Sequence, residues 1–442
     1  MISKTNSTSY SPQDVANILD QCIHMVTNNI ACYSRDAVSD FTRKRKLPPD
    51  VLISFIMQMQ AKGTKSELCH FFSDQPDMPS DSAFCQQRGK ILPAAFQRIL
   101  FLFNNAFQNH ITLKGYHIIA CDGSDVNIPF DPNDKETFCQ HGSNKPYSQF
   151  HVNALYDCLN DIYWDVVIDT ASKTRECDAL KEMILKNNYP ESSIIIADRG
   201  YEKYDLMAYC IENGQKFIIR VKDKDSYSSI LSNIELPEGE FDIHIKKILT
   251  RKQTKEVKEN PDIYQFLSNK TVFSYLDEEH EYYQLEIRVV RFKITNDTYE
   301  CLITNLEENE FSLHDLKELY HLRWSEETSF RSLKYTVGML YFHSKKRNFL
   351  KQEIYASILL YNVSSTIIRN IKCKEESNKV TYDMKINYST ALTNIRLFLK
   401  KFLSVQILIE RIKKFLVPIR PERCYERKVK PQSAKPFINR VS

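Results

Sequence analysis

Two aspartates directly follow short apolar runs in the middle of the chain. Asp122 follows residues 118–121, and Asp198 follows residues 194–197. A glycine stands close after each, and because a turn-forming aspartate beside glycine is common, either motif alone would be interpreted as a turn. In open α/β sheets, however, ligands bind beyond the carboxyl ends of strands, so two such carboxylates could face one crevice.

Four further polar residues are spaced to share one face of a helix. They occur at offsets of 0, 3, 7 and 14 and are Tyr320, Arg323, Glu327 and Lys334. At about 100° per residue, they fall within roughly 60° of arc. An exposed face with ion pairs, such as Glu327 with Arg323, would be the ordinary interpretation of this pattern.

The surrounding sequence predicts an α/β sheet that would position the aspartates. Short runs rich in β-branched and aromatic residues indicate strands, and apolar positions at 3-to-4 spacing indicate helices. Strands are expected at residues 116–121, 150–156, 162–168, 194–197 and 216–221, and helices at residues 176–186 and 203–213. Because the first connections are too short for crossover helices, the sheet should be mixed in direction.

A long helix at residues 313–337 is expected to carry the four polar residues. Ser312 and Asp315 form a capping box at its start, and Gly338 ends it. Next to the polar face lies an apolar stripe that would dock the helix on the sheet. The stripe contains Leu319, Leu322, Phe330, Leu333 and Val337. The polar face is therefore expected to point into a cleft.

Together, these motifs resemble those of a known enzyme family. The spacing Tyr320-x2-Arg323-x3-Glu327-x6-Lys334 resembles the YREK signature of the insertion-sequence-four group of bacterial DDE transposases. Residues 122–124, Asp-Gly-Ser, look like the first-aspartate motif of that family, and residues 198–201, Asp-Arg-Gly-Tyr, look like its second. The resemblance covers about residues 116–337. It implies an α/β fold: a ribonuclease-H-like mixed sheet with helices, a β-strand insertion before the last catalytic helix, and a helical N-terminal domain.

The resemblance also implies a role for each candidate residue. Asp122, Asp198 and Glu327 would be the catalytic triad and the ligands of two Mg²⁺ ions, for which Mn²⁺ would substitute. Mg²⁺ prefers oxygen ligands, and a pair of ions suits phosphodiester chemistry. The DNA-binding residues would hold phosphates of the terminal nucleotides and are Tyr320, Arg323 and Lys334.

The implied enzyme is a transposase. It would bind the ends of an insertion sequence, cleave DNA by metal-dependent hydrolysis and join the 3′-OH ends to target DNA by transesterification. The implied partners are transposon-end DNA, target DNA and a second copy of the chain in a synaptic homodimer, without a nucleotide cofactor. Two alternatives stay open: a domesticated, catalytically silent DNA-binding protein, and a related nuclease without strand transfer.

The same interpretation divides the chain into five parts. They are a helical N-terminal DNA-binding region at 1–110, the first part of the ribonuclease-H-like core at 111–222, a mostly β insertion at 223–299, the second part of the core with the YREK helix at 300–370, and a helical and basic C-terminal region at 371–442.

Basic charge is concentrated at the end of the chain. The whole sequence has a formal net charge of +4, whereas residues 401–442 hold 11 Lys and Arg against three Asp and Glu. A solvated tail and an arm that lies along a phosphate backbone both fit this composition, and we favour the arm.

Other features exclude several classes of protein. The 12 cysteines include no CxxC pair, which argues against a disulfide framework or a zinc site and favours a reducing cytosol. No apolar run is long enough to span a membrane, so we expect a cytoplasmic protein. The resemblance to bacterial transposases implies that it is bacterial and associated with the nucleoid. Motifs for nucleotide binding and for serine hydrolases are absent. His141 and His151 are interpreted as local hydrogen-bonding residues.

Overall fold

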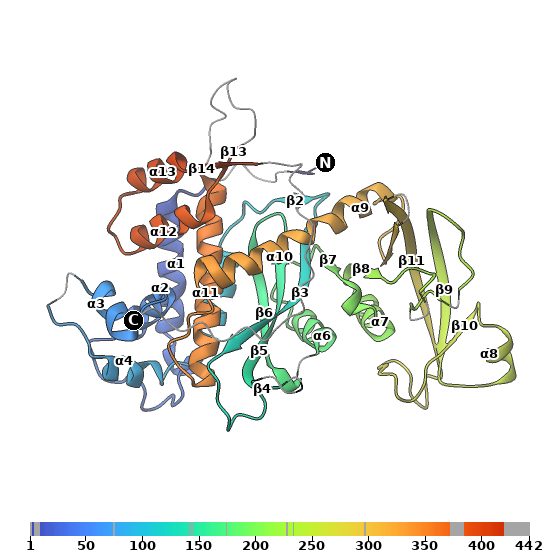
Figure 1. Cartoon of the computed structure of the whole chain (residues 1–442), viewed down its shortest axis with the longest axis horizontal. Helices are drawn as coiled ribbons and strands as arrows, with labels where there is room; N and C mark the ends of the chain where they lie inside the picture. Colours follow the sequence, from blue (N-terminus) through green and yellow to red (C-terminus); the bar gives the residue numbers. More distant parts are fainter. Residues whose placement is uncertain are drawn as a thin grey trace, which may run out of the picture.

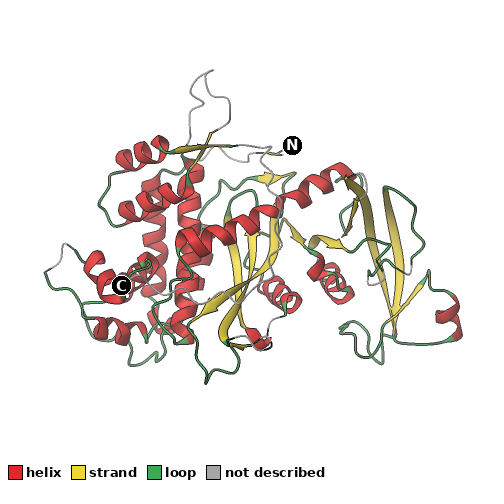
Figure 2. Cartoon of the chain, in the orientation of Figure 1, coloured by secondary structure: helices red, strands yellow, loops and turns green. Residues whose placement is uncertain are grey.

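A mixed β-sheet of ten strands forms the centre of the computed structural model (Figure 1, Figure 2). The structure describes residues 2–3, 9–73, 76–140, 142, 145–173, 175–226, 229–232, 234–295, 298–371 and 384–419. Within this part of the chain, the strand order is β10-β9-β11-β12-β8-β7-β3-β5-β4, and β6 also pairs with β5. Helices cover both faces of this sheet.

Five strands form the part of the sheet that carries the two aspartates. They are β3 (His117–Ile128), β5 (Tyr147–Asp157), β6 (Ile162–Thr170), β7 (Ser193–Ala197) and β8 (Lys216–Val221). Strand β5 is antiparallel to both β3 and β6, whereas β7 is parallel to β3 and to β8. The prediction of a sheet mixed in direction is therefore confirmed.

Strand β3 is longer than the sequence predicted. The expected strand ended at residue 121, but pairing with β5 continues from Asp122 to Ile128. Val126 and Ile128 alternate along this extension and are buried, and their burial holds it in the sheet. Asp122 therefore lies within a strand, at the point where the neighbouring strand β7 ends, and not where the chain leaves the sheet.

The predicted β segment after residue 222 extends the same sheet. Its elements are β9 (Phe241–Thr250), α8 (Lys255–Glu259), β10 (Tyr264–Phe266), β11 (Tyr282–Thr295) and β12 (Thr298–Thr304). Strand β12 pairs antiparallel with β8, and β11 pairs with both β12 and β9. These strands therefore prolong the sheet away from the aspartates, toward the right of Figure 1.

Two predicted helices cover one face of the sheet. They are α6 (Glu176–Lys186) and α7 (Tyr204–Glu212). Leu180, Met183 and Leu206 pack from these helices into one apolar core with Ile119 of β3. Ile118, the preceding residue, belongs to a different core on the opposite face. This alternation follows from the two-residue repeat of a strand and gives the sheet a helical layer on each side.

The amino-terminal and carboxy-terminal helices share a third apolar core, which also includes Val126 of β3 and Val152 of β5. The amino-terminal set is α1 (Pro12–Thr27), α2 (Pro49–Gln58), α3 (Thr64–Phe71), α4 (Asp81–Arg88) and α5 (Ala94–Asn105). The later set is α11 (Arg347–Asn370), α12 (Tyr388–Leu399) and α13 (Val405–Lys414). Helix α11 lies beside α1 and α2 although they are far apart in sequence (Figure 1).

Short strands and turns complete the described elements. They are β1 (Ile2–Ser3), β2 (Thr112–Leu113), β4 (Phe138–Cys139), β13 (Met384–Ile386), β14 (Leu416–Pro418), η1 (Ile30–Tyr33), η2 (Ala171–Lys173) and η3 (Arg199–Tyr201). The predicted basic arm falls largely on residues 420–442, outside the described residues. None of the helices described here has the length and apolar character needed to cross a membrane.

The long helix predicted at residues 313–337 is wound in three segments. Helix α9 (Leu313–Leu322) starts at the predicted capping box, α10 (Trp324–Arg331) follows, and η4 (Ser332–Val337) is a π-helix that ends at Gly338 with φ 91°. The assumption of 100° per residue therefore fails over the last six residues. The apolar stripe nevertheless docks the helix, because Leu319, Phe330 and Leu333 are buried.

Candidate active site

The two strand aspartates are brought together at the middle of the sheet. Cys121 of β3 and Ala197 of β7 are partners in a parallel pair, and each aspartate is the next residue. Neighbouring strands run about 4.8 Å apart, so the two carboxylates start from adjacent backbone positions. The Asp198 carboxylate accepts a hydrogen bond from the Gly200 amide at 2.7 Å, which fixes it at the start of η3. The sequence pattern correctly indicated this juxtaposition.

Asp122 is partly buried among other acids. Its Oδ1 accepts a hydrogen bond from the Gly123 amide at 2.8 Å, and 26% of its side chain is exposed. The pKa of Asp122 is raised to about 6, mainly by burial; the Gly123 amide and Arg323 oppose this shift, and the carboxylates of Asp198 and Glu176 add to it. The raised pKa of Asp122 is therefore mainly the cost of holding a carboxylate partly away from water.

Arg323 joins Asp122 to the helix acid. Its Nη1 lies 3.9 Å from Asp122 Oδ2, and its Nη2 donates a hydrogen bond to Glu327 Oε1 at 3.0 Å. Only 4% of this arginine is exposed, so the guanidinium fills the space between the two carboxylates. Helix α10 packs against β3 and thereby holds Glu327 across the arginine from Asp122.

Lys334 and Tyr320 lie at the two ends of this polar row. Lys334 Nζ donates hydrogen bonds to Ser124 Oγ at 2.7 Å and to the Asp125 carbonyl at 2.6 Å, so it follows β3 beyond Asp122. Tyr320 is 3% exposed, and burial raises the pKa of its hydroxyl to about 12. Arg323 and Lys334 of the predicted face therefore lie against β3, whereas Tyr320 is enclosed in an apolar core.

The donor chemistry of the site fits a hard divalent cation. Asp122, Asp198 and Glu327 offer only carboxylate oxygens, which Mg²⁺ and Mn²⁺ prefer. Within the residues that the structure describes, no three His, Cys, Asp or Glu side chains lie close enough together to hold a metal ion. The acids would therefore have to be drawn closer to share one.

Two further acids belong to the surroundings of Asp122 and were not among the sequence predictions. Glu176 begins α6 and reaches the site from the other face of the sheet. Glu326 is 0% exposed, and neither of its carboxylate oxygens has a hydrogen-bond partner among the described residues. Burial raises the pKa of Glu326 well above its usual value, and the charge of Asp122 adds to this shift. Its position directly before Glu327 is the only signal in the sequence.

His151 has the local role that was expected of it. Its Nδ1 lies 2.8 Å from Asp125 Oδ1, and its Nε2 lies 3.2 Å from Glu176 Oε1. Burial lowers the pKa of His151, but the two carboxylates outweigh burial and bring it to about 9. The imidazole is therefore a cation at pH 7. His141 lies outside the described residues.

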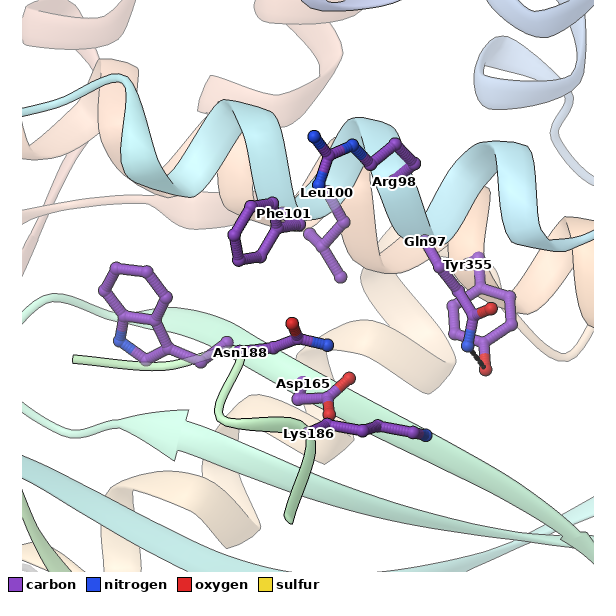
Figure 3. A pocket seen from close by; sticks show the side chains of 9 residues that line it. Gln97, Arg98, Leu100, Phe101, Asp165, Lys186, Asn188 and Tyr355 are labelled. Atoms are coloured by element: carbon purple, nitrogen blue, oxygen red, sulfur yellow. Dashed lines mark hydrogen bonds between the residues drawn. The ribbon is translucent and has the colours of Figure 1, made fainter. Parts of the chain in front are cut away.

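A cavity of about 200 Å³ lies between α5 and the strand β6, apart from the acidic site (Figure 3). It is lined by Gln97, Arg98, Leu100, Phe101, Trp164, Asp165, Lys186, Asn188 and Tyr355. Asp165 is 8% exposed, and its Oδ2 has no hydrogen-bond partner among the described residues. Burial raises the pKa of Asp165 to about 6, opposed by the charge of Lys186.

Replacing Asp165 by Asn is expected to stabilise the protein at neutral pH. In the unaltered chain, the folded state keeps the Asp165 proton between pH 4 and 6 while the unfolded state loses it, so the free energy of unfolding falls as pH rises through this window. The variant lacks this loss, and at pH 7 it should gain about 1–3 kcal/mol. Urea unfolding at pH 4 to 8 measures the difference. Asp178→Asn, at an exposed position of α6, is the control, and equal gains in both variants would contradict the assignment.

Three comparisons relate the chain to known proteins. Residues 113–363 match the family model of the transposase DDE domain. The chain is 22% identical over 321 residues to the transposase for insertion sequence element IS1151 of Clostridium perfringens, and the match covers 67% of each chain. The chain is also similar to a solved structure, a cryo-EM structure of the piggyBac transposase synaptic complex with hairpin DNA. The alignment covers 96% of this chain and 89% of the piggyBac chain, with 12% sequence identity and a TM-score of 0.42. The family match extends from β2 into α11.

Proposed function

Because the chain belongs to the transposase DDE domain family, we propose that it binds the ends of an insertion sequence, cleaves DNA by metal-dependent hydrolysis and joins the 3′-OH ends to target DNA. The observation that carries this proposal is the meeting of Asp122 and Asp198 on neighbouring strands, with Arg323 joining Asp122 to Glu327. We further assign the chain to the insertion-sequence-four group with its YREK signature. The name of the Clostridium perfringens relative supports the coarser statement, an insertion-sequence transposase.

In this proposal the three acids hold the cation and the reacting phosphate is fixed by basic residues. Asp122, Asp198 and Glu327 would hold two Mg²⁺ ions, or Mn²⁺ in their place. When bound, such ions activate the attacking oxygen and stabilise the leaving oxygen of a phosphodiester. Arg323 keeps Asp122 and Glu327 joined until a phosphate competes for its guanidinium fork.

Tyr320 is proposed to act on DNA through Arg323. Its ring centroid lies 5.8 Å from the Arg323 guanidinium carbon, and the tyrosine itself is enclosed. The ring therefore limits where the guanidinium can move when a phosphate binds. Trp324, which is 42% exposed, stands next to the arginine and offers a surface on which a base could stack.

We also propose a ribonuclease-H-like core and the five-part division of the chain. The order β6-β5-β3-β7-β8, with antiparallel pairing on one side of β3 and parallel pairing on the other, supports this core. The region at 1–110 and the basic region at 371–442 would contact DNA beside the core parts at 111–222 and 300–370, which flank the insertion at 223–299. Two chains would act as a homodimer on paired ends, in the nucleoid of a bacterial cytoplasm.

The test of the function is a cleavage and joining assay. The intact chain is incubated with Mg²⁺ or Mn²⁺, a labelled duplex that carries the inverted repeats flanking its gene, and a supercoiled target plasmid. We expect nicks that leave a 3′-OH and products joined to the plasmid. Nicks without joined products would identify a nuclease instead.

A catalytically silent DNA-binding protein is the second candidate. The observation that favours it is that Arg323 separates Asp122 from Glu327 and that no described group of three side chains could hold a metal ion. The same assay distinguishes the two functions. Binding of the duplex with cleavage in neither Mg²⁺ nor Mn²⁺ would establish the silent protein.

Replacing Lys334 by Ala is expected to weaken binding of end DNA and to flatten its salt dependence. One lost phosphate contact reduces the slope of log affinity against log salt by about 0.9 on duplex DNA. Fluorescence anisotropy of a labelled duplex at several salt concentrations gives this slope. Lys317→Ala, at an exposed position of α9, is the control. An unchanged slope would mean that Lys334 serves only to hold Ser124 and the end of β3.

A further inference from the structure

Helix α10, which carries Glu327, has little helix propensity of its own. It is a segment of eight residues between α9 and the π-helix η4, and three of the eight are Ser or Thr. Each of these hydroxyls donates to a backbone carbonyl three or four residues earlier: Ser325 to Leu322, Thr328 to Trp324 and Ser329 to Glu326. Such bonds slightly destabilise and bend helices. The orientation of α10, and with it the position of Glu327, therefore depends on contacts outside the helix.

A buried tyrosine of the sheet supplies such a contact. Tyr163 of β6 is 0% exposed, and its hydroxyl lies 2.7 Å from Ser329 Oγ. The serine hydroxyl has one hydrogen and donates it to the Glu326 carbonyl at 2.7 Å, so the tyrosine donates the other bond. The tyrosine ring also packs against Phe330, with the ring centroids 5.8 Å apart. This chain of hydrogen bonds ends on the residue directly before Glu327.

The orientation that these bonds fix is opposed by a buried acid. It places the Glu326 side chain in the core, where neither carboxylate oxygen has a hydrogen-bond partner among the described residues. Burial of such a group is unfavourable. The same orientation holds Glu327 at 3.0 Å from Arg323, on the side of Asp122. A turn of the helix by one residue, about 100°, would release Glu326 and carry Glu327 away from Asp122.

The backbone of the tyrosine is itself held from two helices. Its amide donates to Asn362 Oδ1 at 2.9 Å, and its carbonyl accepts from Asn362 Nδ2 and Asn104 Nδ2, both at 2.8 Å. Asn362 of α11 and Asn104 of α5 are buried and bond to each other at 2.9 Å. A hydroxyl on a backbone fixed in this way is a rigid point from which to hold α10.

We propose that Tyr163 is a positioning residue for the reaction, because its hydroxyl fixes, through Ser329, the orientation of α10 that places Glu327 across Arg323 from Asp122. This inference rests on the proposed function, in which Glu327 acts. Tyr163 lies in the core and cannot touch DNA, so its effect passes through the backbone of α10. A displacement of about 1 Å at a catalytic group can slow a reaction about a hundredfold.

The first test measures single-turnover cleavage of labelled end DNA, the Kd for that DNA and the Tm of the intact chain. Tyr163→Phe keeps the ring and removes the hydroxyl, and Ser329→Ala breaks the same bond from the other side. We expect each to slow cleavage about ten- to a hundredfold while the Kd changes less than about twofold. Because both act on one bond, the double variant should be no slower than the slower single variant. Additive losses would contradict the assignment of this bond.

Tyr156→Phe is the matched control. Tyr156 is 1% exposed and lies in the same core, with its ring centroid 5.0 Å from that of Tyr163. Its hydroxyl bonds to Asp161 and Tyr361, and not to α10. Loss of this hydroxyl should lower the Tm by a similar amount and leave cleavage within about twofold. A purely structural role of Tyr163 predicts that cleavage follows the Tm equally in both tyrosine variants, and that result would overturn the proposal.

A second measurement does not depend on cleavage. Hydrogen–deuterium exchange of the intact chain without DNA reports on the amides of residues 324–331. We expect faster exchange of this segment in Tyr163→Phe and unchanged exchange in Tyr156→Phe. Unchanged exchange in Tyr163→Phe, or unchanged cleavage by it beside an active unaltered chain, would overturn the inference and leave the proposed function standing. Absence of cleavage by the unaltered chain would overturn the proposed function, while faster exchange in Tyr163→Phe would still support the hold of Tyr163 on α10.

Discussion

DNA cleavage is expected to fall at least about a thousandfold when Asp122 is replaced by Asn, while binding of the DNA ends persists. Asparagine keeps the shape of the side chain and can still accept the Gly123 hydrogen bond, so the strand should not move. What disappears is the charge that the proposed cation needs. We expect the same result for Asp198→Asn and Glu327→Gln, measured as single-turnover cleavage of labelled end DNA in Mg²⁺ and in Mn²⁺.

The controls for these variants come from the helical segments α9 and α10, the second of which carries Glu327. Glu318→Gln changes an exposed glutamate of α9 and should leave cleavage within about twofold. Glu326→Gln tests the neighbouring buried acid, whose pKa is raised by burial, and should also leave the cleavage rate nearly unchanged. Retained cleavage in Glu327→Gln together with lost cleavage in Glu326→Gln would move the helix ligand to Glu326. Lost end binding in Asp122→Asn would mean that the substitution disturbs more than the chemistry.

The meeting of Asp122 and Asp198 could be predicted because its causes are local. Each aspartate follows an apolar run that forms a strand, although β3 continues past Asp122, and the helices after residue 170 require parallel crossover connections between the later strands. The capping box at Ser312 and the terminating Gly338 are likewise local signals, and both lie where they were expected. Elements whose limits depend on nearby residues were therefore readable from the sequence.

The winding at the end of the long helix could not be predicted, because it depends on packing far away in sequence. Leu333 and Val337 of η4 belong to the core that includes α11 and the amino-terminal helices. Their burial and the bonds of Lys334 to β3 accompany the π winding, which no periodicity over residues 313–337 reports. π-Helical turns of this kind are rare and often occur at functional sites.

Glu176 escaped prediction for a related reason. Its helix was expected at the correct residues, but which strand ends lie beside its first turn depends on how α6 crosses the sheet. His151 contacts both Glu176 and Asp125, and Asp125 is 26 residues away in the sequence. Neither separation matches a motif spacing, so only the folded arrangement shows that the histidine lies between the two acids.

Arg88→Met is expected to lower the free energy of unfolding by about 3–5 kcal/mol. Arg88 is 1% exposed and joins α4 to α11: its Nη2 lies 2.8 Å from Glu353 Oε1 and donates to the Phe349 carbonyl at 2.6 Å, and its Nε donates to Gln352 Oε1 at 2.8 Å. Removing the guanidinium would leave the Glu353 carboxylate in the core with only His343 beside it. Urea unfolding monitored by circular dichroism measures the loss.

A matched pair of variants decides whether this loss comes from the buried contact. Arg98→Met removes an exposed arginine from α5 and should cost less than about 0.5 kcal/mol. Combining Arg88→Met with Glu353→Gln removes the stranded charge, so the double variant should be more stable than the sum of the single losses predicts. If Arg88→Met lowers the free energy of unfolding no more than Arg98→Met does, the ion pair between Arg88 and Glu353 does not stabilise the packing of the amino-terminal helices. The expected large loss would instead mean that the amino-terminal helices unfold together with α11, because the charge of the buried Arg88 on α4 is paired with Glu353 on α11.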